Sequence, residues 1–438
     1  PSESKAAENI FIPADPALPG LTAVLNSEEI ASALGKQTIS AGWDDTSCER
    51  FYIRYKPGMN CIAAYRAKAG NQGESDLAIY AKAYTIADFA LARQKAQEHR
   101  WVGGDAPPVI ELPQECALLF VFPNDFALEG LRILTDPKKI QRLLYQWCDW
   151  IDETHWRISD RRLTVTPVRY KPERRAVFKC STRATHRGAG ERQAVNVYAR
   201  VYADDRGASV FDFMNEMTQR LKYNATLATP RALGYLPDRR LLMITELPGA
   251  ALNDRFSPQS AAERGAQAAE ALAVLHTLPP TSAPERSTAD LLKELRDCGA
   301  ELCERRPALA SDVRVTIEEI AQRIDGTPDR FHGLVHGDFH LGQLIADSER
   351  IGVIDFDRSY TGDQYADLGE LLAHEIADPA PALEAYEKHS GRRVQPARLN
   401  AWRAFRTLLI AAGAHRRLEP NWREQESAAL NECQTLLT

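Results

Sequence analysis

One pattern occurs twice in this chain of 438 residues, about 115 residues apart. Residues 54–57 (RYKP) return as residues 169–172, and residues 79–84 (IYAKAY) return as residues 197–202 (VYARVY). Alternation of apolar and polar residues predicts a β-strand at each of these places. Because the order of the elements is kept, we predict an internal duplication, so that the chain folds as related units and not as one large domain.

The first copy predicts a plan of three strands, a helix and a further strand. Strands are expected over residues 51–55, 61–67, 77–84 and 118–122, with a helix over about 87–99 and a short capped helix over 27–35. Each third strand carries a basic residue, Lys82 or Arg200, and a glutamate follows sixteen positions later, Glu98 or Glu216. The two copies therefore share charged residues as well as apolar ones.

A second feature, residues 336–343 (HGDFHLGQ), carries the strongest chemical signal. Asp355 follows Asp338 by seventeen residues, and two short apolar segments around a polar break predict a β-hairpin between them. A hairpin would bring both carboxylates to one small volume, which suits metal-assisted phosphoryl transfer. An HGD triplet alone would carry little weight, since Asp-rich turns often only end an element.

The combination of His336-Gly337-Asp338 with Gln343 and Asp355 resembles the catalytic and metal-binding loops of the aminoglycoside phosphotransferase-like kinases. These kinases are relatives of the protein kinases, whose catalytic loop reads H-G/R-D-x-x-x-x-N. The family mostly has Asn where this chain has Gln343, and HGDxHLGQ looks most like the maltokinase and bacterial glucosamine kinase branch. The resemblance covers roughly residues 163–438.

The duplication and the resemblance together imply an α+β, bilobal, protein-kinase-like fold with a duplicated N-terminal lobe. We expect an N-terminal cap domain over residues 1–135, a nucleotide-binding lobe over 136–249 and a mainly helical C-terminal lobe over 250–438. Helices in the last part are predicted over about 257–277, 287–303, 312–324, 366–376, 380–389 and 396–409, with one more near the terminus. The catalytic motifs follow only the second copy.

The resemblance implies a role for each residue of the loops. Asp338 is the expected catalytic base, and Gln343 and Asp355 are the expected Mg²⁺ ligands, because hard oxygen donors suit that ion. Asp357 is either a further metal or substrate contact or a structural residue at the hairpin exit. His340 is a candidate substrate contact.

Three further residues are expected to support the loops. His336 should brace the catalytic loop by hydrogen bonds, His276 should be a packed residue at a helix end, and Asp367 should tie the C-terminal lobe to the loop.

Nucleotide-binding residues are expected in the second copy. Arg200 stands where most kinases carry a phosphate-binding lysine, and Glu216 is its expected partner; the alternative is a solvated strand arginine. No G-x-G-x-x-G loop is present, and Arg174 and Arg175 occupy the corresponding turn. They either bind phosphate by charge, where a glycine loop uses backbone amides, or are exposed turn residues.

The first copy is expected to bind no nucleotide, because the chain has only one set of catalytic acids. Lys82 and Glu98 are therefore interpreted as a structural pair in a cap. Changing Lys82 should then leave the KM for ATP unchanged, whereas changing Arg200 should raise it.

Composition excludes several other classes of protein. A net charge of -6 argues against nucleic acid as the main partner, and the eight cysteines form no C-x-x-C pair that would indicate a zinc site or a disulfide framework. No apolar run approaches the roughly 20 residues of a membrane span. The polar N-terminus lacks the pattern of a signal peptide, so a cytoplasmic protein is expected.

The predicted function is a kinase that uses ATP and Mg²⁺ to phosphorylate a hydroxyl group of a small molecule, with a sugar or an amino sugar as the expected acceptor. Two alternatives stay open at this point. One is an aminoglycoside phosphotransferase that confers antibiotic resistance. The other is a catalytically inactive kinase-like binding module, favoured by Arg200, Gln343 and the missing glycine loop and disfavoured by the intact acids.

Overall fold

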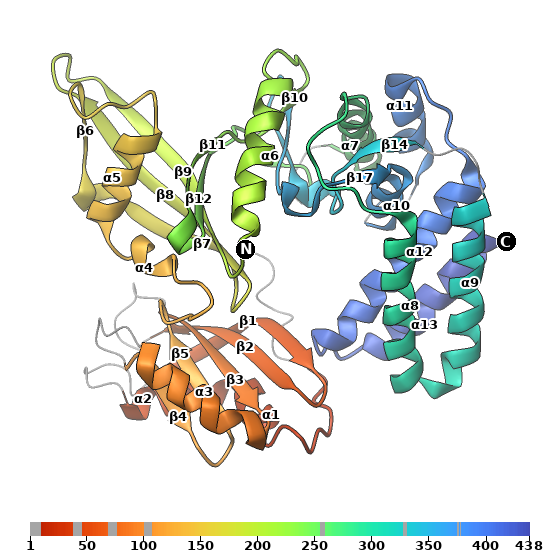
Figure 1. Cartoon of the computed structure of the whole chain (residues 1–438), viewed down its shortest axis with the longest axis horizontal. Helices are drawn as coiled ribbons and strands as arrows, with labels where there is room; N and C mark the ends of the chain where they lie inside the picture. The colour runs from red at the N-terminus through yellow and green to blue at the C-terminus, as the bar shows by residue number, and fades with distance from the viewer. Residues whose placement is uncertain are drawn as a thin grey trace. The chain divides into compact units, whose positions relative to one another are not determined.

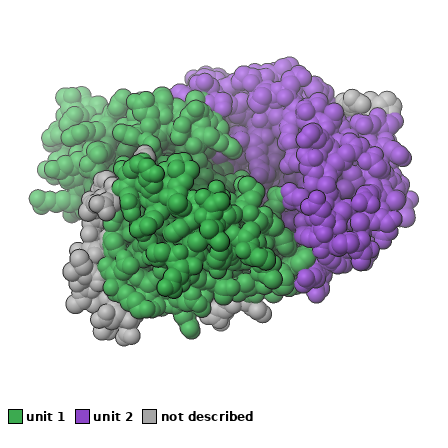
Figure 2. Space-filling view, turned by 60° about the horizontal axis from the view of Figure 1, so that its bottom comes forward, with its two compact units in different colours: residues 1–208, 233–243, 414–422 green, residues 209–232, 244–413, 423–438 purple. Residues whose placement is uncertain are grey.

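The computed structural model of the chain describes residues 10–37, 46–68, 77–99, 107–254, 259–326, 331–374, 376 and 378–438 (Figure 1). The chain forms two compact units, coloured separately in Figure 2. Unit 1 consists of residues 1–208, 233–243 and 414–422, and unit 2 of residues 209–232, 244–413 and 423–438. Both contain helices and strands, which confirms the α+β class.

The first sheet of unit 1 has five strands in the order β1-β2-β3-β5-β4. Its strands are β1 (Ser47–Lys56), β2 (Asn60–Lys68), β3 (Leu77–Tyr84), β4 (Val109–Leu112) and β5 (Ala117–Val121). Three helices belong to this copy: α1 (Leu21–Leu25), α2 (Ser27–Gln37) and α3 (Ile86–His99). The predicted strands and helices are confirmed, and β4 and α1 are additions that the sequence pattern missed.

The second sheet repeats this plan. Its order is β11-β12-β9-β8-β6, and β7 also pairs with β8. The strands are β6 (Trp156–Ile158), β7 (Thr164–Lys171), β8 (Arg175–His186), β9 (Arg192–Tyr202), β11 (Ala232–Leu236) and β12 (Leu241–Thr245), accompanied by helices α4 (Leu131–Leu134) and α5 (Pro137–Trp147). Helix α6 (Arg206–Arg220) follows β9 in the chain, and its residues from Ser209 onward belong to unit 2. The path β7-β8-β9-β12-β11 has the same order as β1-β2-β3-β5-β4, strand for strand, as expected if the N-terminal lobe is duplicated.

Backbone hydrogen bonds repeat along with the strand order. The amide of Tyr84 donates to the carbonyl of Cys116, and the amide of Tyr202 donates to the carbonyl of Arg240, both at 3.0 Å. Cys116 and Arg240 both have a left-handed backbone, with φ of 47° and 46°. The two copies thus share even an unfavourable local conformation, which only a repeated tertiary setting would retain.

Apolar side chains of both copies form one continuous core. Tyr80 stacks on Phe120 in the first copy, and the edge of Tyr80 meets Tyr170 of the second. Helix α5 begins at a clear signal, because Asp136 accepts hydrogen bonds from two backbone amides behind Pro137. Burial of this shared surface contributes about 25 cal/mol per Å² of apolar area, so the copies stabilise each other.

Unit 2 is mainly helical, as predicted for the C-terminal part. Its helices are α7 (Ala261–His276), α8 (Thr288–Arg305), α9 (Ala310–Gly326), α10 (Tyr365–Ala373), α11 (Ala380–Ser390), α12 (Pro396–Arg416) and α13 (Trp422–Leu437). Ser260 and Glu263 form a capping box that starts α7, and the predicted start at residue 257 lies outside the described residues. Six short strands complete the unit: β10 (Leu227–Ala228), β13 (Ala250–Ala251), β14 (His332–Val335), β15 (Leu344–Ala346), β16 (Ile351–Val353) and β17 (Tyr360–Asp363).

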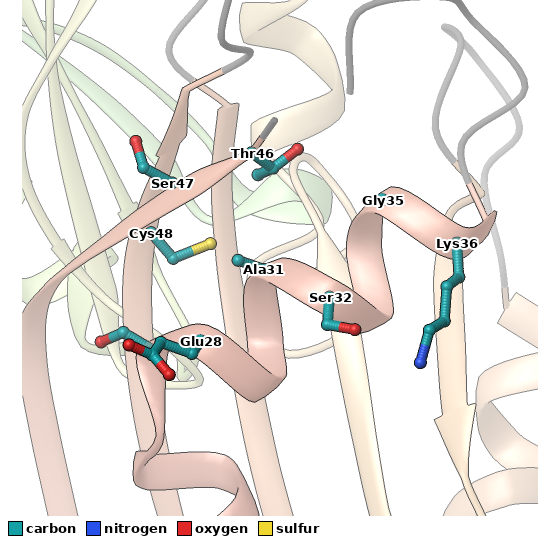
Figure 3. Close-up of a pocket in the computed structure, with 9 residues that line it drawn as sticks. Glu28, Ala31, Ser32, Gly35, Lys36, Thr46, Ser47 and Cys48 are labelled. Carbon is teal, nitrogen blue, oxygen red and sulfur yellow. The ribbon is translucent and has the colours of Figure 1, made fainter. Parts of the chain in front are cut away.

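A pocket of about 610 Å³ opens between α2 and the start of β1 (Figure 3). Its lining residues are Ser27, Glu28, Ala31, Ser32, Gly35, Lys36, Thr46, Ser47 and Cys48. None of the residues predicted to carry chemistry lines this pocket, so the candidate site lies elsewhere.

Two expectations about cysteines and membranes can be compared with the structure. All eight cysteines are free thiols, in agreement with the prediction that they form no disulfide framework. Within the described ranges, no helix combines the length and the apolar character needed to span a bilayer.

Candidate active site

The catalytic loop of unit 2 begins at the end of β14 and depends on a glycine. Gly337 has φ of +79°, and a Cβ atom there would lie 2.5 Å from the carbonyl oxygen of Arg358. Both the left-handed backbone and the close approach require glycine, since any side chain would collide with backbone. The glycine therefore lets the loop turn sharply just before Asp338.

Asp367, at the start of α10, holds the loop from behind. Its carboxylate accepts hydrogen bonds from the backbone amides of His336 at 2.6 Å and Gly337 at 2.8 Å. His276 also contacts this carboxylate through Nε2 at 3.2 Å, and Nδ1 of His276 contacts the Tyr386 hydroxyl at 2.9 Å. Burial lowers the pKa of His276 despite the nearby carboxylate. The structural roles predicted for Asp367 and His276 are confirmed.

The predicted hairpin is present as β15 and β16, paired from Leu344 with Val353 to Ala346 with Ile351. It is fixed to the catalytic loop by His336, whose Nε2 lies 3.0 Å from the carbonyl oxygen of Ile354. This contact confirms the bracing role predicted for His336, and it places the residue after Ile354 beside the loop.

Three predicted side chains converge at the end of this hairpin. Nε2 of Gln343 lies 3.3 Å from Oδ2 of Asp338 and 3.5 Å from Oδ2 of Asp355. Asp355 is 9% exposed and has φ of 69°, an unfavourable conformation that a non-glycine residue adopts only where its surroundings hold it. The two acids thus share one amide neighbour, as the hairpin prediction required.

Arg358 is a member of this site that the sequence did not reveal. Its Nη1 lies 3.3 Å from Oδ1 of Asp338. Burial acts to raise the pKa of Asp338, but nearby charges, led by that of the Arg358 guanidinium, outweigh it, and the pKa lies below its usual value. Asp338 is therefore ionised at neutral pH and can accept a proton.

His340 lies between the catalytic loop and α10. Its Nδ1 accepts a hydrogen bond from the amide of Gly342, and its ring centroid lies 5.1 Å from that of His374. Burial lowers the pKa of His340, although the charge of Asp338 acts in the opposite direction. A neutral, half-buried imidazole beside the base is suited to contact a hydroxylated acceptor, and this role stays a prediction.

The acids and amide of the site can be tested for their fit to Mg²⁺. No group of three or more His, Cys, Asp and Glu residues suited to a metal exists in the part of the chain that the structure describes. Mg²⁺ in kinases, however, needs only one or two protein oxygens, because phosphates and water complete its octahedron. Asp355 and the amide oxygen of Gln343 fit this requirement, whereas the metal role of Asp357, which is half-buried in a 3₁₀ turn, stays a prediction.

The predicted nucleotide-binding residues are divided between the units. Arg174, Arg175 and Arg200 belong to unit 1, where Arg200 is buried on β9 opposite Val177. Glu216 belongs to unit 2, and its partners there are the Arg220 guanidinium at 2.8 Å and the amide and hydroxyl of Ser282. A pairing of Arg200 with Glu216 therefore stays a prediction.

The partner of Lys82 differs from the one that the sequence predicted. Its Nζ lies 2.8 Å from both carboxylate oxygens of Glu173, and the Arg54 guanidinium lies 3.2 Å from the same carboxylate. Glu98 is exposed and accepts instead from Gln94. The prediction of a Lys82–Glu98 pair was wrong, because the third strand of the sheet turns Lys82 toward the second copy and not toward α3.

The sequence contained an unused signal for this region. Residues 15–21 (DPALPGL) return as residues 125–131 (DFALEGL), immediately before the two helix pairs. Asp15 and Asp125 then make the same hydrogen bonds in their own copies. Comparing the residues upstream of RYKP in both copies would have shown that the repeat begins here.

Comparisons with known proteins identify the family of the chain. The family described as "Phosphotransferase enzyme family" matches residues 180–408, more than half of the chain. No curated protein matches the chain significantly.

Solved structures also show similarity. A choline/ethanolamine kinase family protein from Mesorhizobium loti has 17% identity and a TM-score of 0.46, covering 63% of this chain and 88% of its own. A macrolide 2'-phosphotransferase from Brachybacterium faecium has 18% identity and a TM-score of 0.46, covering 68% and 98%. A choline kinase from Cryptosporidium parvum has 11% identity and a TM-score of 0.47, covering 69% and 95%.

Proposed function

We propose that this chain, which belongs to the phosphotransferase enzyme family, is an ATP- and Mg²⁺-dependent kinase that phosphorylates a hydroxyl group of a sugar or an amino sugar. The observation that carries the proposal is the convergence of Asp338, Gln343 and Asp355 at the end of one hairpin. Phosphoryl transfer requires mainly positioning and charge stabilisation, which this arrangement of an ionised acid and further oxygen donors supplies.

Asp338 orients the acceptor. Its ionised carboxylate accepts a hydrogen bond from the acceptor hydroxyl and takes the proton as the new oxygen–phosphorus bond forms. The low pKa of Asp338 suits this order of events, because the carboxylate is ionised before the acceptor arrives. Arg358 maintains that charge, and it contacts a different carboxylate oxygen of Asp338 from the one that Gln343 contacts.

Gln343 and Asp355 would hold Mg²⁺, and Asp357 is a further candidate. When bound, the ion neutralises phosphate charge and holds the nucleotide phosphates for transfer. Gln343 now donates its amide N–H groups toward the two acids, so the amide would turn to present its oxygen. That rotation requires no backbone change, because the amide ends a flexible side chain.

For the nucleotide, the proposal assigns the phosphates to Arg200, Arg174 and Arg175 of the second copy. Guanidinium groups bind phosphate oxygens in pairs, which compensates for the absence of a glycine-rich loop. Arg174 is exposed at the tip of its turn, and Arg200 is buried on β9. Glu216, which lies on the helix that follows β9, is proposed as the partner of Arg200.

A sugar or amino sugar is favoured over a polycationic aminoglycoside because the described acids of residues 363–375, at the end of β17 and in α10, already have partners. Asp363 pairs with Arg398 and accepts from Trp402, while Asp367 holds the catalytic loop. Glu370 pairs with Arg406 and with His374. Glu375, a fourth acid of this segment, lies outside the described residues. Few carboxylates are thus available to bind several ammonium groups at once.

The test is consumption of ATP with and without Mg²⁺ in the presence of monosaccharides, disaccharides, amino sugars and kanamycin-type compounds. The proposal predicts Mg²⁺-dependent turnover with a sugar or amino sugar, lost in Asp338→Asn. Turnover with aminoglycosides alone would replace the acceptor class. Calorimetric binding of nucleotide without turnover on any acceptor would identify an inactive binding module.

A further inference from the structure

The turn between the first two strands has the same length in both copies but a different residue at its tip. Lys56 pairs with Asn60 across the first turn, and Lys171 pairs with Arg175 across the second. Three residues lie between the paired residues in each case. The register between the second and third strands also agrees in the two copies. Lys82 on β3 pairs with β2 at the position where Arg200 on β9 pairs with β8.

The backbone of each turn is held by an aspartate. The amide of Gly58 donates to Asp15 at 2.8 Å, and the amide of Glu173 donates to Asp125 at 2.8 Å. Hydroxyls of the tyrosines in the two RYKP segments donate to the same aspartates. Glu173 therefore occupies the position that glycine occupies in the first copy.

Glu173 adopts this position against its backbone preference. Its φ is 58°, where Gly58 has 65°, and the left-handed conformation is unfavourable for a residue with a side chain. A glutamate at such a place implies that its side chain contributes something a glycine would not. Nothing in the turn itself supplies that gain.

The side chain of Glu173 leaves its own sheet and contacts the first copy. Both carboxylate oxygens contact Nζ of Lys82 at 2.8 Å, and the Arg54 guanidinium adds a contact at 3.2 Å. The side chains of Glu173, Lys82 and Arg54 are 22%, 15% and 17% exposed. Two largely covered cations, on the strands β1 and β3 that flank β2, thus hold one carboxylate. This fixes the tip of the turn more firmly than a single surface ion pair does.

We propose that the first copy is a positioning element for the nucleotide turn of the second. Lys82 and Arg54 hold Glu173, so that the turn from Lys171 to Arg175 keeps one conformation in which its arginines meet the nucleotide phosphates. Lys82 and Glu173 are positioning residues in this scheme, because they act through the turn. The effect on nucleotide binding rests on the proposed kinase function, whereas the fixing of the turn does not depend on that function.

Charge gives a second reason for the arrangement. Glu173 directly precedes Arg174, so an unneutralised carboxylate there would repel an incoming phosphate and attract the arginine meant for it. The cations of the first copy remove that conflict. Lys82 thus has a function although the first copy has no catalytic acids of its own. We therefore expect a change at Lys82 to weaken ATP binding, in place of the expectation from the sequence that it would not.

The first measurement is independent of catalysis. Hydrogen–deuterium exchange of a peptide spanning residues 168–176 is compared in wild type, Lys82→Met and Lys82→Arg. Lys68→Ala is the matched control, because Lys68 is an exposed cation of the same sheet. We expect exchange about tenfold faster in Lys82→Met and near the wild-type rate in Lys82→Arg and Lys68→Ala. Unchanged exchange in a folded Lys82→Met protein would overturn the proposal.

The second measurement follows the kinetic constants of Lys82→Met, Glu173→Gln and the double variant. We expect the KM for ATP to rise by roughly 3- to 10-fold, with kcat and the KM for the acceptor within about twofold of wild type. The double variant should be no worse than either single variant, since both remove one interaction. An ATP KM equal to that of wild type, or a parallel rise in both KM values, would overturn the positioning role.

The two measurements distinguish a failure of the proposed function from a failure of the positioning inference. If wild type transfers phosphate to no acceptor, the proposed function is wrong, and hydrogen exchange still decides whether the first copy fixes the turn. If wild type is active and exchange is unaffected by Lys82→Met, the kinase assignment stands and the positioning inference falls.

Discussion

The two copies in unit 1 share strand order, turn length and aspartate anchors, and they differ at the tip of one turn. Gly58 in the first copy meets no side chain or backbone within 4 Å of its would-be Cβ atom, whereas Glu173 in the second copy is held by two cations. The anchors differ as well, since Asp125 is buried and Asp15 is only half-buried. One scaffold therefore occurs twice, and the second version adds side-chain contacts at the tip of its turn to the aspartate anchor that both versions have.

The difference shows how a duplicated lobe can acquire a new use. The first copy has no catalytic acids following it, so its third-strand cation is not required by chemistry of its own. That cation has instead become part of the surface on which the second copy rests. Under the proposed positioning role, a repeat without a nucleotide of its own would still affect binding at its neighbour.

The largest expected effect tests whether phosphoryl transfer depends on the one set of candidate catalytic acids in unit 2. Asp338→Asn should lower kcat by about 10²- to 10⁴-fold, because it removes the group that accepts the hydroxyl proton. Nucleotide affinity from calorimetry and the melting temperature should change little, since Asp338 is 25% exposed and packs no core. Turnover within tenfold of wild type would mean that the acids of unit 2 are not the ones that matter.

A second test asks whether nucleotide binding needs the metal residues as well as the second copy. Asp355→Ala should raise the Kd for ATP in Mg²⁺ by at least the roughly 10- to 100-fold that loss of a residue behind a metal ligand costs. Gln343→Ala should raise it less, since a neutral amide oxygen binds the ion more weakly. Titrations without Mg²⁺ are the control, and an unchanged Kd in Gln343→Ala would make Gln343 a loop residue only.

The buried anchor of the second copy should make stability depend on pH. Burial raises the pKa of Asp125 to about 6, from 3.8, so its contribution to stability is complete below pH 4 and is lost as the pH rises through 6. Asp125→Asn should therefore gain on wild type between pH 4 and 7, by roughly 2–3 kcal/mol at about 1.4 kcal/mol per pH unit. Urea unfolding at several pH values measures the difference, and a constant difference would show that Asp125 is ionised throughout.

The smallest expected effect separates the acceptor side from the nucleotide side. Arg358→Ala removes a charge that holds the pKa of Asp338 down, so the acidic limb of the kcat/KM profile for the acceptor should move to higher pH. The KM for ATP should stay unchanged, in contrast to the variants at Lys82 and Glu173. A profile identical to that of wild type would remove Arg358 from the site.

Much of the candidate site could be predicted from the sequence because its contacts are local. The hairpin, the approach of Asp355 to Asp338 and the bracing by His336 all depend on residues within about twenty positions of one another. Strand alternation and turn residues fix such an arrangement without reference to the rest of the chain. Arg358 lay within this range too, but an exposed arginine has no pattern that points to its partner.

The sequence by itself predicted the repeated pattern, most strands of each copy and a single set of candidate catalytic acids, because all three follow from periodicity and motif spacing. Only the tertiary structure decided what the first copy contacts. Lys82 and Glu173 are 91 residues apart, and Arg54 and Glu173 are 119 apart. No local pattern encodes such a pair, because it depends on how two sheets pack through a shared apolar core, and packing orientation follows from side-chain shape and not from strand propensity.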